Sequence, residues 1–534
     1  MNRLFLSSLL VLVSLLLSGQ SGPFQIRLEP HNIPGFPGIQ SFAFGQYEGK
    51  WVIIGGRLDG LHRRQPFAAF DPVDNNFEIY VVDPGLSRFW KSSIAILPAA
   101  LHEPLSSSNM QFYQEGKYLY LIGGYGFSRS IDNHRTFDAL TAVDLSFLTE
   151  AVVNGTSILP AFRQINDQAF AVTGGQLRKI NEVYHLVGGQ KFDGAYNPMG
   201  HATFTQQYTN QARRFKILDN GTQLRVEHLS TYTDTAQFHR RDYNVVPQIL
   251  PNGDEGLTAF SGVFQTKADI PYLGSVSLDR SGYQVDQGFA QYYNHYHCAH
   301  LGAYDKITKE MHSVFFGGIA QYYEQAGMLV QDNEVPFVKT ISRVTRFADG
   351  RMAEFRLPVE MPDLLGAGAE LIPVPELPEY ANGVLDLNRL TSDTTMIGYI
   401  VGGIRSSAPN IFWNNDGSQS QASPTILKVQ LIRSTLTGTD QLNPQSREGL
   451  FLQVFPNPND GHFQIQFQLA QAEPVRLTIS DESGKTLLRD TIRDLQAGPQ
   501  QLTRDSPDLE KGGTFFIRLE TETAYSVQKI IARP

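Results

Sequence analysis

The densest group of chemically active side chains lies in residues 291–300 (QYYNHYHCAH), which hold three histidines and the single cysteine of the chain. Histidine and cysteine are ligands for zinc and copper. On a strand, His295 and His297 share one face while Cys298 and His300 share the other, so the four cannot bind one ion. No second histidine-rich segment offers partners to His295 and His297. We therefore predict no metal site and no cofactor, with these two histidines as the remaining candidates.

The rest of the sequence lacks the motifs that mark common catalytic sites. It contains no phosphate-binding glycine loop, no nucleophile elbow and no zinc-protease helix. Its carboxylates are scattered, and their spacing pairs no two of them as acid and base. The formal net charge of −9 disfavours a nucleic-acid partner, because such a protein needs a basic surface to displace counterions from phosphates. We predict no catalytic residues.

The composition indicates that strands and tight turns position these side chains. Of 534 residues, 41% are hydrophobic and 18% charged, which is typical of a chain that folds. The 47 glycines, 34 phenylalanines and 22 tyrosines favour pleated strands joined by turns. The length suits one large domain and a small one. A single cysteine rules out an internal disulfide framework and a multi-cysteine zinc site.

An apolar strand that runs into two glycines recurs along the chain. The full copies are WVIIGG, YLYLIGG, VYHLVGG, HSVFFGG and IGYIVGG, and a weaker copy, LTAFSG, ends at Gly262. Glycine at these positions permits φ > 0 and lets neighbouring backbones come close. The repeat glycines are Gly55, Gly56, Gly123, Gly124, Gly188, Gly189, Gly317, Gly318, Gly402 and Gly403.

Hairpin signals follow the glycine pairs. Asn220-Gly221 and Asp349-Gly350 each separate two strand-like runs, and Ser281-Gly282 marks a similar turn. Asn-Gly and Asp-Gly favour a type I′ turn, which requires φ > 0 at both central residues. Each unit then holds enough strands for a four-stranded antiparallel sheet. Such sheets bury both faces only when they pack radially, so the fold class is an all-β propeller.

The double glycine at the end of a second strand resembles the kelch repeat, over roughly residues 24 to 433. The resemblance implies a kelch-like β-propeller in residues 23–433, with six blades, or seven if Gly174-Gly175 marks a unit of its own. Most units lack the tryptophan usual in kelch blades. TILKVQLI (425–432) leaves the last blade one strand short. FQIRLEPHNIPG (24–35) is the expected outermost strand of that blade, because it would close the open seam.

In kelch propellers two sets of loops open on one face: those leading into each innermost strand and those after each double glycine. Arginine forks bind carboxylates and aromatic rings stack on sugars, so this face favours an acidic glycan or a carboxylated small molecule. The alternative is that these side chains pair with neighbouring loops. The candidate ligand-binding residues are Arg63, Arg64, Arg129, His239, Arg240, Arg241, Tyr292, Tyr293, His295 and Arg405.

The N-terminal segment predicts export. Arg3 supplies a positive start, and Leu4 to Leu17 form an apolar stretch too short for a permanent membrane span. Small residues follow, so residues 1–22 are expected to be a cleaved signal peptide. No cysteine lies beside the cleavage site, which disfavours a lipoprotein. No other stretch is long and apolar enough for a transmembrane anchor.

The C-terminal segment follows a polar linker at residues 434–449. Residues 450–534 show period-2 alternation between turn signals, which predicts a small Ig-like β-sandwich. The Pro-Asn-Pro run in FPNPNDG, the Asp481 to Gly484 turn, the Leu509 to Phe516 run and the Lys529 strand resemble the type A sorting domain of the Bacteroidota type IX secretion system. The resemblance implies the secretion machinery as a partner, and a final location outside the cell or on the outer-membrane surface.

These observations predict a secreted or cell-surface binding propeller that recognises a glycan or another extracellular polymer. An enzyme on the same scaffold is the alternative, because some kelch proteins resemble sugar-acid mutarotases and others resemble copper oxidases. A structural component of a surface assembly is a third alternative. The fold alone cannot choose among them, because propellers support many unrelated functions.

Overall fold

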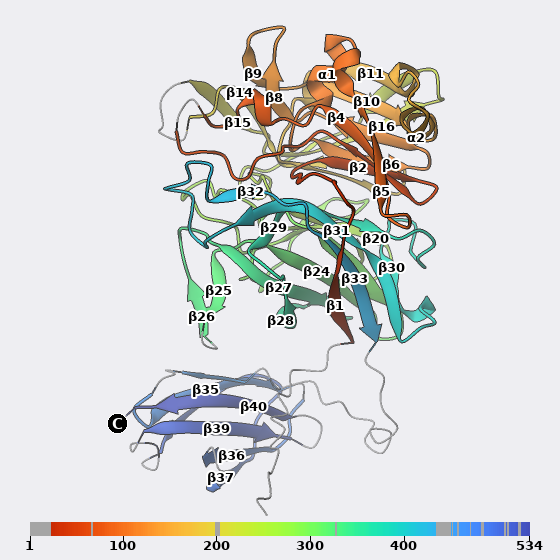
Figure 1. The fold of residues 1–534 in the computed structure, drawn as a ribbon. Helices are drawn as coiled ribbons and strands as arrows, with labels where there is room; N and C mark the ends of the chain where they lie inside the picture. Colours follow the sequence, from red (N-terminus) through yellow and green to blue (C-terminus); the bar gives the residue numbers. More distant parts are fainter. Residues whose placement is uncertain are drawn as a thin grey trace, which may run out of the picture. The chain divides into compact units, whose positions relative to one another are not determined.

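The computed structural model describes residues 23–65, 68–197, 203–325 and 328–433, and, towards the C-terminus, residues 450, 452–455, 459–469, 471–481, 485–506, 509, 512–521 and 525–533. The expected signal peptide (1–22) and linker (434–449) lie outside the described residues, as do the Pro-Asn-Pro run (456–458) and residues 482–484 of the predicted turn. The chain divides into two compact units, one up to Ser434 and one from Thr435 (Figure 1).

The first unit is all-β and propeller-like, and its strands form successive antiparallel sheets. Sheet 1 contains β2 (Ala43–Tyr47), β3 (Lys50–Ile54), β4 (Glu78–Asp83) and β5 (Arg88–Ser93). Sheet 2 contains β6 (Gln111–Glu115), β7 (Tyr118–Ile122), β10 (Ala139–Asp144) and β11 (Phe162–Asn166). Sheet 3 contains β12 (Gln176–Ile180), β13 (Val183–Val187), β16 (Gln211–Asp219) and β17 (Leu224–His228), with β18 (Tyr232–Thr233) beside β16.

The later sheets repeat this order. Sheet 4 contains β19 (Asn244–Ile249), β20 (Glu255–Phe260), β21 (Val276–Leu278) and β22 (Tyr283–Val285). Sheet 5 contains β23 (His300–Asp305), β24 (Glu310–Ile319), β27 (Phe337–Arg346) and β28 (Met352–Glu360), with β30 (Leu385–Asp386) parallel to β23. Sheet 6 contains β29 (Leu365–Pro373), β31 (Thr394–Ser406), β33 (Ile426–Arg433) and β1 (Phe24–His31), with β32 (Ser420–Ala422) beside β31.

Short helical segments lie in the connections. The α-helices are α1 (Ala99–Leu105) and α2 (Leu145–Asn154). Asp144 caps the N-terminus of α2, since its carboxylate accepts hydrogen bonds from the backbone N–H groups of Ser146 and Phe147, and Gly155, in the left-handed region, caps the C-terminus. The 3₁₀ turns are η1 (Pro72–Asp74), η2 (Ile94–Ile96), η3 (Leu159–Ala161), η4 (Gln168–Phe170) and η5 (Leu387–Arg389).

A closed circuit of backbone hydrogen bonds joins the six sheets at the start of their innermost strands. Each residue of the circuit donates its N–H to the carbonyl of the residue from the preceding sheet, over 2.8–3.2 Å. The last bond runs from Ser41 of sheet 1 to Gly368 of sheet 6, so the described sheets follow one another in cyclic order. We call this circuit the belt; its residues are Ser41, Asn109, Gly174, Asp242, His297 and Gly368.

Apolar clusters fill the spaces between successive sheets in the same cyclic order. Within the described residues, separate buried clusters join sheets 1 to 2, 2 to 3, 3 to 4, 4 to 5 and 5 to 6. A further cluster joins sheet 6 to sheet 1 through Val401, Ile426 and Ile53. Both faces of each sheet are therefore covered by apolar side chains. This explains why the strands of the repeat are continuous apolar runs rather than alternating apolar and polar residues.

The repeat glycines behave as predicted. Every residue of the five glycine pairs has positive φ, between 59° and 91°. The first glycine of each pair also lies against the backbone of the next sheet: a Cβ added to Gly123 would lie 2.0 Å from the carbonyl oxygen of Val172. In the weak copy, Ser261 adopts φ = 57° in place of the first glycine. Gly174 and Gly175 instead precede β12, so they do not end a second strand.

The N-terminal strand closes sheet 6 as predicted. Strand β1 pairs antiparallel with β33, from Phe24 opposite Arg433 to His31 opposite Ile426. It is the outermost strand of that sheet. Phe24 is 2% exposed and packs in the cluster between sheets 5 and 6. The first and last strands of the unit therefore lie in one sheet.

The predicted hairpins are present, but the predicted turn type is wrong. Asn220-Gly221 connects β16 to β17, and Asp349-Gly350 connects β27 to β28. In both turns the glycine has positive φ, whereas Asn220 and Asp349 are not among the described residues with positive φ. The connections are longer than two residues, which removes the need for a type I′ turn.

The second unit consists of two antiparallel sheets that share one apolar core. Alternate residues are buried in the strands Val475–Asp481 and Gly513–Glu520, as the period-2 pattern predicts. One sheet contains β34 (Gln453–Phe455), β35 (His462–Leu469) and β38 (Gly498–Asp505). The other contains β36 (Val475–Asp481), β37 (Thr486–Ile492), β39 (Gly513–Glu520) and β40 (Tyr525–Ala532).

Candidate ligand-binding face

The loops at the belt end of the sheets form what we call the loop face: the segments after each double glycine and those leading into each innermost strand. Three of the segments after the glycines contain hairpins rather than the plain loops that the sequence predicted. Figure 1 shows these hairpins projecting from the same side of the unit. They are β8 (Tyr125–Ser128) with β9 (Asn133–Thr136), β14 (Gln190–Gly194) with β15 (Phe204–Tyr208), and β25 (Tyr322–Gln325) with β26 (Met328–Gln331).

Arg240 and Arg241 are neighbours in sequence, but they occupy different environments. Arg240 is 1% exposed. Its Nε donates to the carbonyl of Gln237 (2.7 Å), and its Nη1 donates to the carbonyls of Ser261 and of Gly274 (2.9 Å). The guanidinium also lies 4.1 Å from the centre of the Tyr272 ring. Arg240 is therefore a structural residue that ties its loop to sheet 4, and it does not present its charge to a ligand.

Arg241 lies partly exposed beside the belt. Its Nε donates to the hydroxyl of Tyr208 (3.0 Å), its Nη1 pairs with the carboxylate of Asp242, and its plane lies 5.2 Å from the Phe264 ring centre. Tyr208 stacks on His239 with ring centres 3.8 Å apart. The hairpin β14–β15 thus orients two of the predicted residues from one side. Because three partners restrain it, the Arg241 guanidinium already has one orientation, and it would lose little conformational entropy when a ligand binds.

A group of aromatic rings fills the space between the first, third and sixth loops. The His62 ring contacts Phe70, Tyr196 and Phe412, with centres 5.6, 4.9 and 6.1 Å apart. Burial lowers the pKa of His62 to about 4, so its imidazole is neutral. Its Nδ1 is buried and has no hydrogen-bond partner among the described residues. This core supports the arginines that follow His62 in the sequence.

Arg63 and Arg64 lie against the loop between β31 and β32. The Arg64 guanidinium lies 4.2 Å from the centre of the Trp413 ring, and its backbone N–H donates to the carbonyl of Asn415 (2.8 Å). Trp413 is 63% exposed, the most exposed aromatic side chain described. Among the described residues, neither arginine forms an ion pair, so both retain charge for a ligand.

Tyr292 and Tyr293 belong to the loop that leads into β23. Tyr292 is 42% exposed and packs edge to face on Tyr322 of hairpin β25–β26, with ring centres 5.2 Å apart. The backbone N–H of Tyr293 donates to the carboxyl group of Glu354 (3.0 Å). The tyrosine pair is thus a second exposed aromatic surface, and Glu354 holds the loop that carries it.

His295 lies beneath this loop in a buried chain of hydrogen bonds. Its Nδ1 donates to the carbonyl of Gly317 (2.6 Å), and its Nε2 lies 2.9 Å from Ser342 Oγ, which in turn lies 3.1 Å from Glu354 Oε1. Burial lowers the pKa of His295 to about 4, so Nε2 accepts the single hydroxyl proton of Ser342. The Ser342–Glu354 bond then needs a proton from Glu354, whose pKa burial raises to about 7.

The loop face is less basic than the sequence predicted. Arg405 pairs with Asp363 (2.5 Å), Lys191 with Asp193 (3.2 Å), and Arg241 with Asp242. Acidic side chains of the same segment (Asp193 and Asp242) or of another loop (Asp363) therefore neutralise these three cations. Arg129 is exposed at the tip of hairpin β8–β9. The candidates that keep an unpaired charge among the described residues are Arg63, Arg64 and Arg129.

The histidine-rich segment does not assemble a metal site. His295 is 0% exposed and saturated by Gly317 and Ser342, whereas His297 bonds to Glu370 (2.9 Å). No group of three or more potential metal-ligating side chains occurs among the residues that the structure covers. Cys298 is buried, and burial raises the pKa of its thiol to about 12.

Sequence reasoning missed several residues of this face. Tyr196, Tyr208 and Trp413 lie close to the predicted arginines but belong to inserted hairpins or to a long loop. A usable signal existed for Trp413, because it is a rare tryptophan within a polar Asn, Gly and Ser segment. Nothing in the sequence pattern pairs Tyr208 with Arg241, since the contact depends on how the hairpin folds back.

Comparison with known proteins identifies the C-terminal unit. Residues 453–533 match the family model of the secretion system C-terminal sorting domain. The chain is therefore exported by the type IX secretion system to the cell surface or the extracellular space. Within the described residues, none of the helices has the length and apolar character needed to cross a membrane. No curated protein matches the chain.

Solved structures resemble the chain only weakly. A cryo-EM structure of RAG in complex with one melted and one unmelted RSS aligns at TM-score 0.36 and 12% identity, over 76% of this chain and 99% of that one. A family 43 arabinoxylan arabinofuranohydrolase from Bacillus subtilis aligns at TM-score 0.29 and 11% identity, over 94% of both chains. RS223-β-xylosidase aligns at TM-score 0.27 and 9% identity, over 75% of this chain and 94% of that one. Similarity at this level identifies no activity.

Proposed function

We propose that the exported protein, from a member of the Bacteroidota, binds an acidic extracellular glycan on the loop face of a six-bladed kelch-like propeller. Residues 1–22 are the signal peptide, 23–433 the propeller, 434–449 a linker and 450–534 an Ig-like sorting domain. The Arg64–Trp413 pair carries the proposal. A ring that is 63% exposed offers an apolar platform for a sugar face, and the guanidinium beside it binds a carboxylate.

The cyclic order of the sheets supports the propeller. The belt takes one residue from each sheet and returns to its starting point, which requires sheet 6 to lie beside sheet 1. The cluster that contains Val401 and Ile53 fills that same junction. The double glycines directly follow the second strands of sheets 1, 2 and 3, as in kelch blades, whereas in sheets 5 and 6 they lie within β24 and β31. Six blades account for every sheet of four or five strands in the described ranges of the first unit, and the three two-stranded sheets are the hairpins of the loop face.

The arrangement of aromatic rings supports a glycan rather than a compact anion. Trp413 and the Tyr292–Tyr322 pair are separate exposed surfaces on loops of different blades. Two such platforms suit an extended chain, because successive sugars can each stack on a ring. A small anion would need only the arginines. Glycans with carboxylates therefore fit the residues better than neutral glycans or inorganic anions.

No observation favours an enzyme over this binding function. His295 is a buried neutral side chain, and the Glu354 carboxyl group is engaged by Ser342 and by the backbone of Tyr293. Asp59 and Asp74, which act electrostatically on each other and lie within range of Arg63, are both paired with Arg57. A copper oxidase or a mutarotase would need reactive groups at such positions.

Isothermal titration of the mature protein with oligogalacturonates and with neutral cello-oligosaccharides tests the proposal. We expect binding of the acidic oligomers, weakened at least tenfold (about 1.4 kcal/mol) by Arg64→Ala and by Trp413→Ala. Arg88→Ala is the matched control: Arg88 lies 4.2 Å from the Trp90 ring centre, the same geometry, at the start of β5 and away from the loop face. Equal binding by Arg64→Ala and wild type, or a preference for the neutral oligomers, would overturn the proposal.

A further inference from the structure

One buried side chain, that of Asn415, connects the two loops that carry Arg64 and Trp413. Asn415 is 0% exposed. Its Nδ2 donates to the carbonyl of Leu61 (2.7 Å) and to the carbonyl of His62 (3.0 Å). Its backbone carbonyl accepts a hydrogen bond from the N–H of Arg64 (2.8 Å). Asn415 thus holds the backbone of the arginine loop at three points.

The remaining polar atom of this side chain is used within its own loop. Oδ1 of Asn415 accepts a hydrogen bond from the backbone N–H of Gly417 (3.1 Å). Asparagine provides two donors and an acceptor on a short side chain, whereas aspartate has no donor and alanine has no polar atom. At this buried position aspartate would bring its charge against two carbonyl oxygens, and alanine would leave these oxygens without their donor. The contacts therefore require the amide of asparagine.

The loop that carries Asn415 also lies against the side chains of both arginines. The Trp413 ring centre lies 4.2 Å from the guanidinium of Arg64. Gly417 has φ = 97°, and a Cβ added to it would lie 2.5 Å from Nε of Arg63. Neither arginine has an ion pair among the described residues that would hold its guanidinium. The direction of each side chain therefore depends on this loop and on the backbone that Asn415 fixes.

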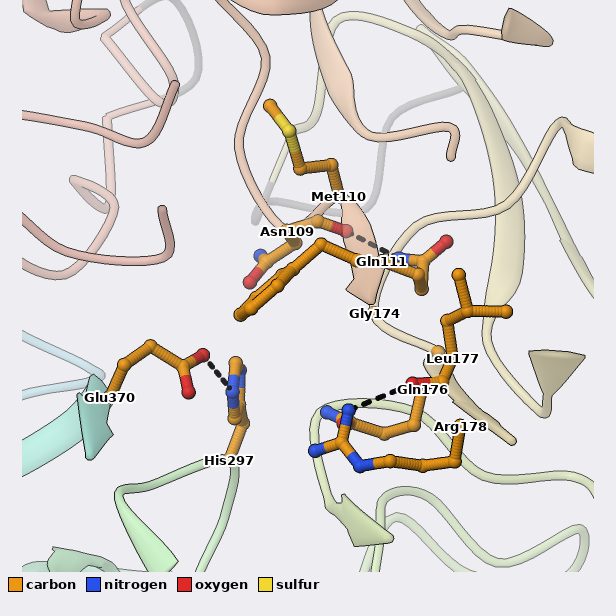
Figure 2. A pocket seen from close by; sticks show the side chains of 11 residues that line it. Asn109, Met110, Gln111, Gly174, Gln176, Leu177, Arg178, His297 and Glu370 are labelled. Atoms are coloured by element: carbon orange, nitrogen blue, oxygen red, sulfur yellow. Dashed lines mark hydrogen bonds and ion pairs between the residues drawn. The ribbon is translucent and has the colours of Figure 1, made fainter. Parts of the chain in front are cut away.

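Asn415 differs from the buried polar side chains inside the belt. Figure 2 shows Glu370 of sheet 6 bonded to the ring of His297, which leads into sheet 5, and the two atoms lie 2.9 Å apart. That bond joins one side chain to another, and both line a small cavity. Asn415 instead binds carbonyl groups of a backbone that carries two arginines. Its bonds therefore determine where the charges of these arginines lie.

We propose that Asn415 is the positioning residue of the loop face: it holds the guanidinium of Arg64 over the Trp413 ring before a ligand binds. A guanidinium that is already in place loses little conformational entropy on binding, which raises the affinity for a carboxylate. Asn415 is fully buried and does not touch the ligand. The effect on affinity rests on the proposed function, whereas the placement of Arg64 can be measured without a ligand.

Fluorine nuclear magnetic resonance of the mature full chain, labelled with 5-fluorotryptophan, measures the placement of Arg64. The chain has 3 tryptophans, and Trp413→Phe identifies the Trp413 signal. A guanidinium over an indole ring interacts with its π electrons, so Arg64→Ala should shift the Trp413 signal. Asn415→Ala should shift it in the same direction. The signals of Trp90 and of Trp51, which is 1% exposed in the cluster between sheets 6 and 1, should not move.

Two further variants separate positioning from a folding defect. Asn415→Asp keeps the shape and the acceptor oxygen but lacks both donors, so it should also shift the Trp413 signal. Ser420→Ala is the matched control, because it removes another buried bond between the same two segments, from the N–H of Leu61 to Ser420 Oγ (2.9 Å). It should leave the Trp413 signal at its wild-type position. An unshifted Trp413 signal in either Asn415 variant, an equal shift in Ser420→Ala, or a simultaneous shift of the Trp51 signal would overturn the proposal.

Isothermal titration with oligogalacturonates measures the consequence for binding. Asn415→Ala should weaken binding about fivefold or more, whereas Ser420→Ala should stay within about twofold of wild type. Because Asn415 acts through Arg64, the double variant Arg64→Ala/Asn415→Ala should bind no more weakly than Arg64→Ala alone. Wild-type affinity in Asn415→Ala, or additive losses in the double variant, would contradict the positioning role. If no oligomer binds the wild-type protein, the glycan proposal fails, while the fluorine shifts still decide whether Asn415 places Arg64.

Discussion

The belt and the loop face occupy the same end of the six sheets, but they use their residues differently. In the belt, backbone N–H and C=O groups make the joining contacts, and five of its residues adopt positive φ. On the loop face, side chains decide the outcome: Arg240 is buried beneath carbonyls, whereas Arg241 remains partly exposed beside it. The backbone circuit repeats from sheet to sheet, while each loop is folded individually. Stability should therefore depend most on the former.

The largest loss of stability is expected where a side chain would enter the contact between the first glycine of a pair and the backbone of the next sheet; we call this contact the backbone junction. In Gly123→Ala the new Cβ would lie 2.0 Å from the carbonyl oxygen of Val172, at φ = 67°. We expect a loss of more than about 3 kcal/mol in the free energy of unfolding, measured by urea denaturation. Gly116→Ala is the control, since Gly116 has φ = 58° with nothing within 4 Å, and it should cost about 1 kcal/mol. Equal losses would refute the role of the junction.

The adjacent arginines give the next largest difference. Arg240→Ala leaves the carbonyls of Ser261 and Gly274 without their donor and should cost about 2–4 kcal/mol of unfolding free energy. Arg241→Ala removes a partly exposed ion pair with Asp242 and should cost about 1 kcal/mol or less. Thermal and urea unfolding of both variants measure this order. If Arg241→Ala proved the more damaging of the two, our assignment of their environments would be wrong.

The proton on Glu354 makes stability depend on pH. Its pKa in the folded protein, about 7, lies above the ordinary value of 4.5, so the folded state holds the proton more tightly than the unfolded state. The stabilisation that the Glu354 proton gives to the folded state is fully present below pH 4.5 and is lost as the pH rises through 7. Glu354→Gln mimics the protonated form and should remove a decline on the order of 1–3 kcal/mol between pH 5 and pH 8. The same slope in wild type and variant would contradict this proton assignment.

The smallest change in stability, and the one predicted increase, is expected in the weak copy of the repeat. Ser261 has φ = 57°, is 0% exposed, and its hydroxyl has no partner in the described residues. Ser261→Gly restores the double glycine and removes both penalties, so it should raise the unfolding free energy by about 0.5–1 kcal/mol. Differential scanning calorimetry would record the higher melting temperature. A lower melting temperature would mean that the Ser261 hydroxyl forms a stabilising hydrogen bond, and would contradict this prediction.

The sheets could be predicted because the same backbone requirement recurs. The first glycine of each pair has positive φ and lies against the backbone of the next sheet, so glycine is required at each such contact and can be recognised in the sequence. These glycines are Gly55, Gly123, Gly188, Gly317 and Gly402. The N-terminal closing strand was also predictable, because the last sheet lacked one strand. The type I′ turns were not, since the longer connections allow Asn220 and Asp349 to keep ordinary backbone angles.

The candidate site was predicted only in part. The loops that bear Arg64, Arg241 and Tyr292 lie at one end of the sheets, as the pattern predicts, but the partners of these residues, Trp413, Tyr208 and Tyr322, come from segments distant in sequence. Burial of Arg240 has no local signal either, because it depends on carbonyls 21 and 34 residues away. Ion pairs such as Arg405–Asp363 join separate loops, so the net charge of a face cannot be counted from one strand end alone.

The seam in sheet 6 has a mechanical consequence. Phe24 of β1 lies opposite Arg433 of β33, so the two ends of the first unit leave the sheet at the same edge and the same end of an antiparallel pair. Tension between those ends would break the hydrogen bonds between β1 and β33 in succession, in the unzipping geometry, rather than loading all of them at once in shear. Traction between a held N-terminal end and a C-terminal sorting domain would therefore separate β1 from β33 before it strained the belt, which joins the sheets through other residues.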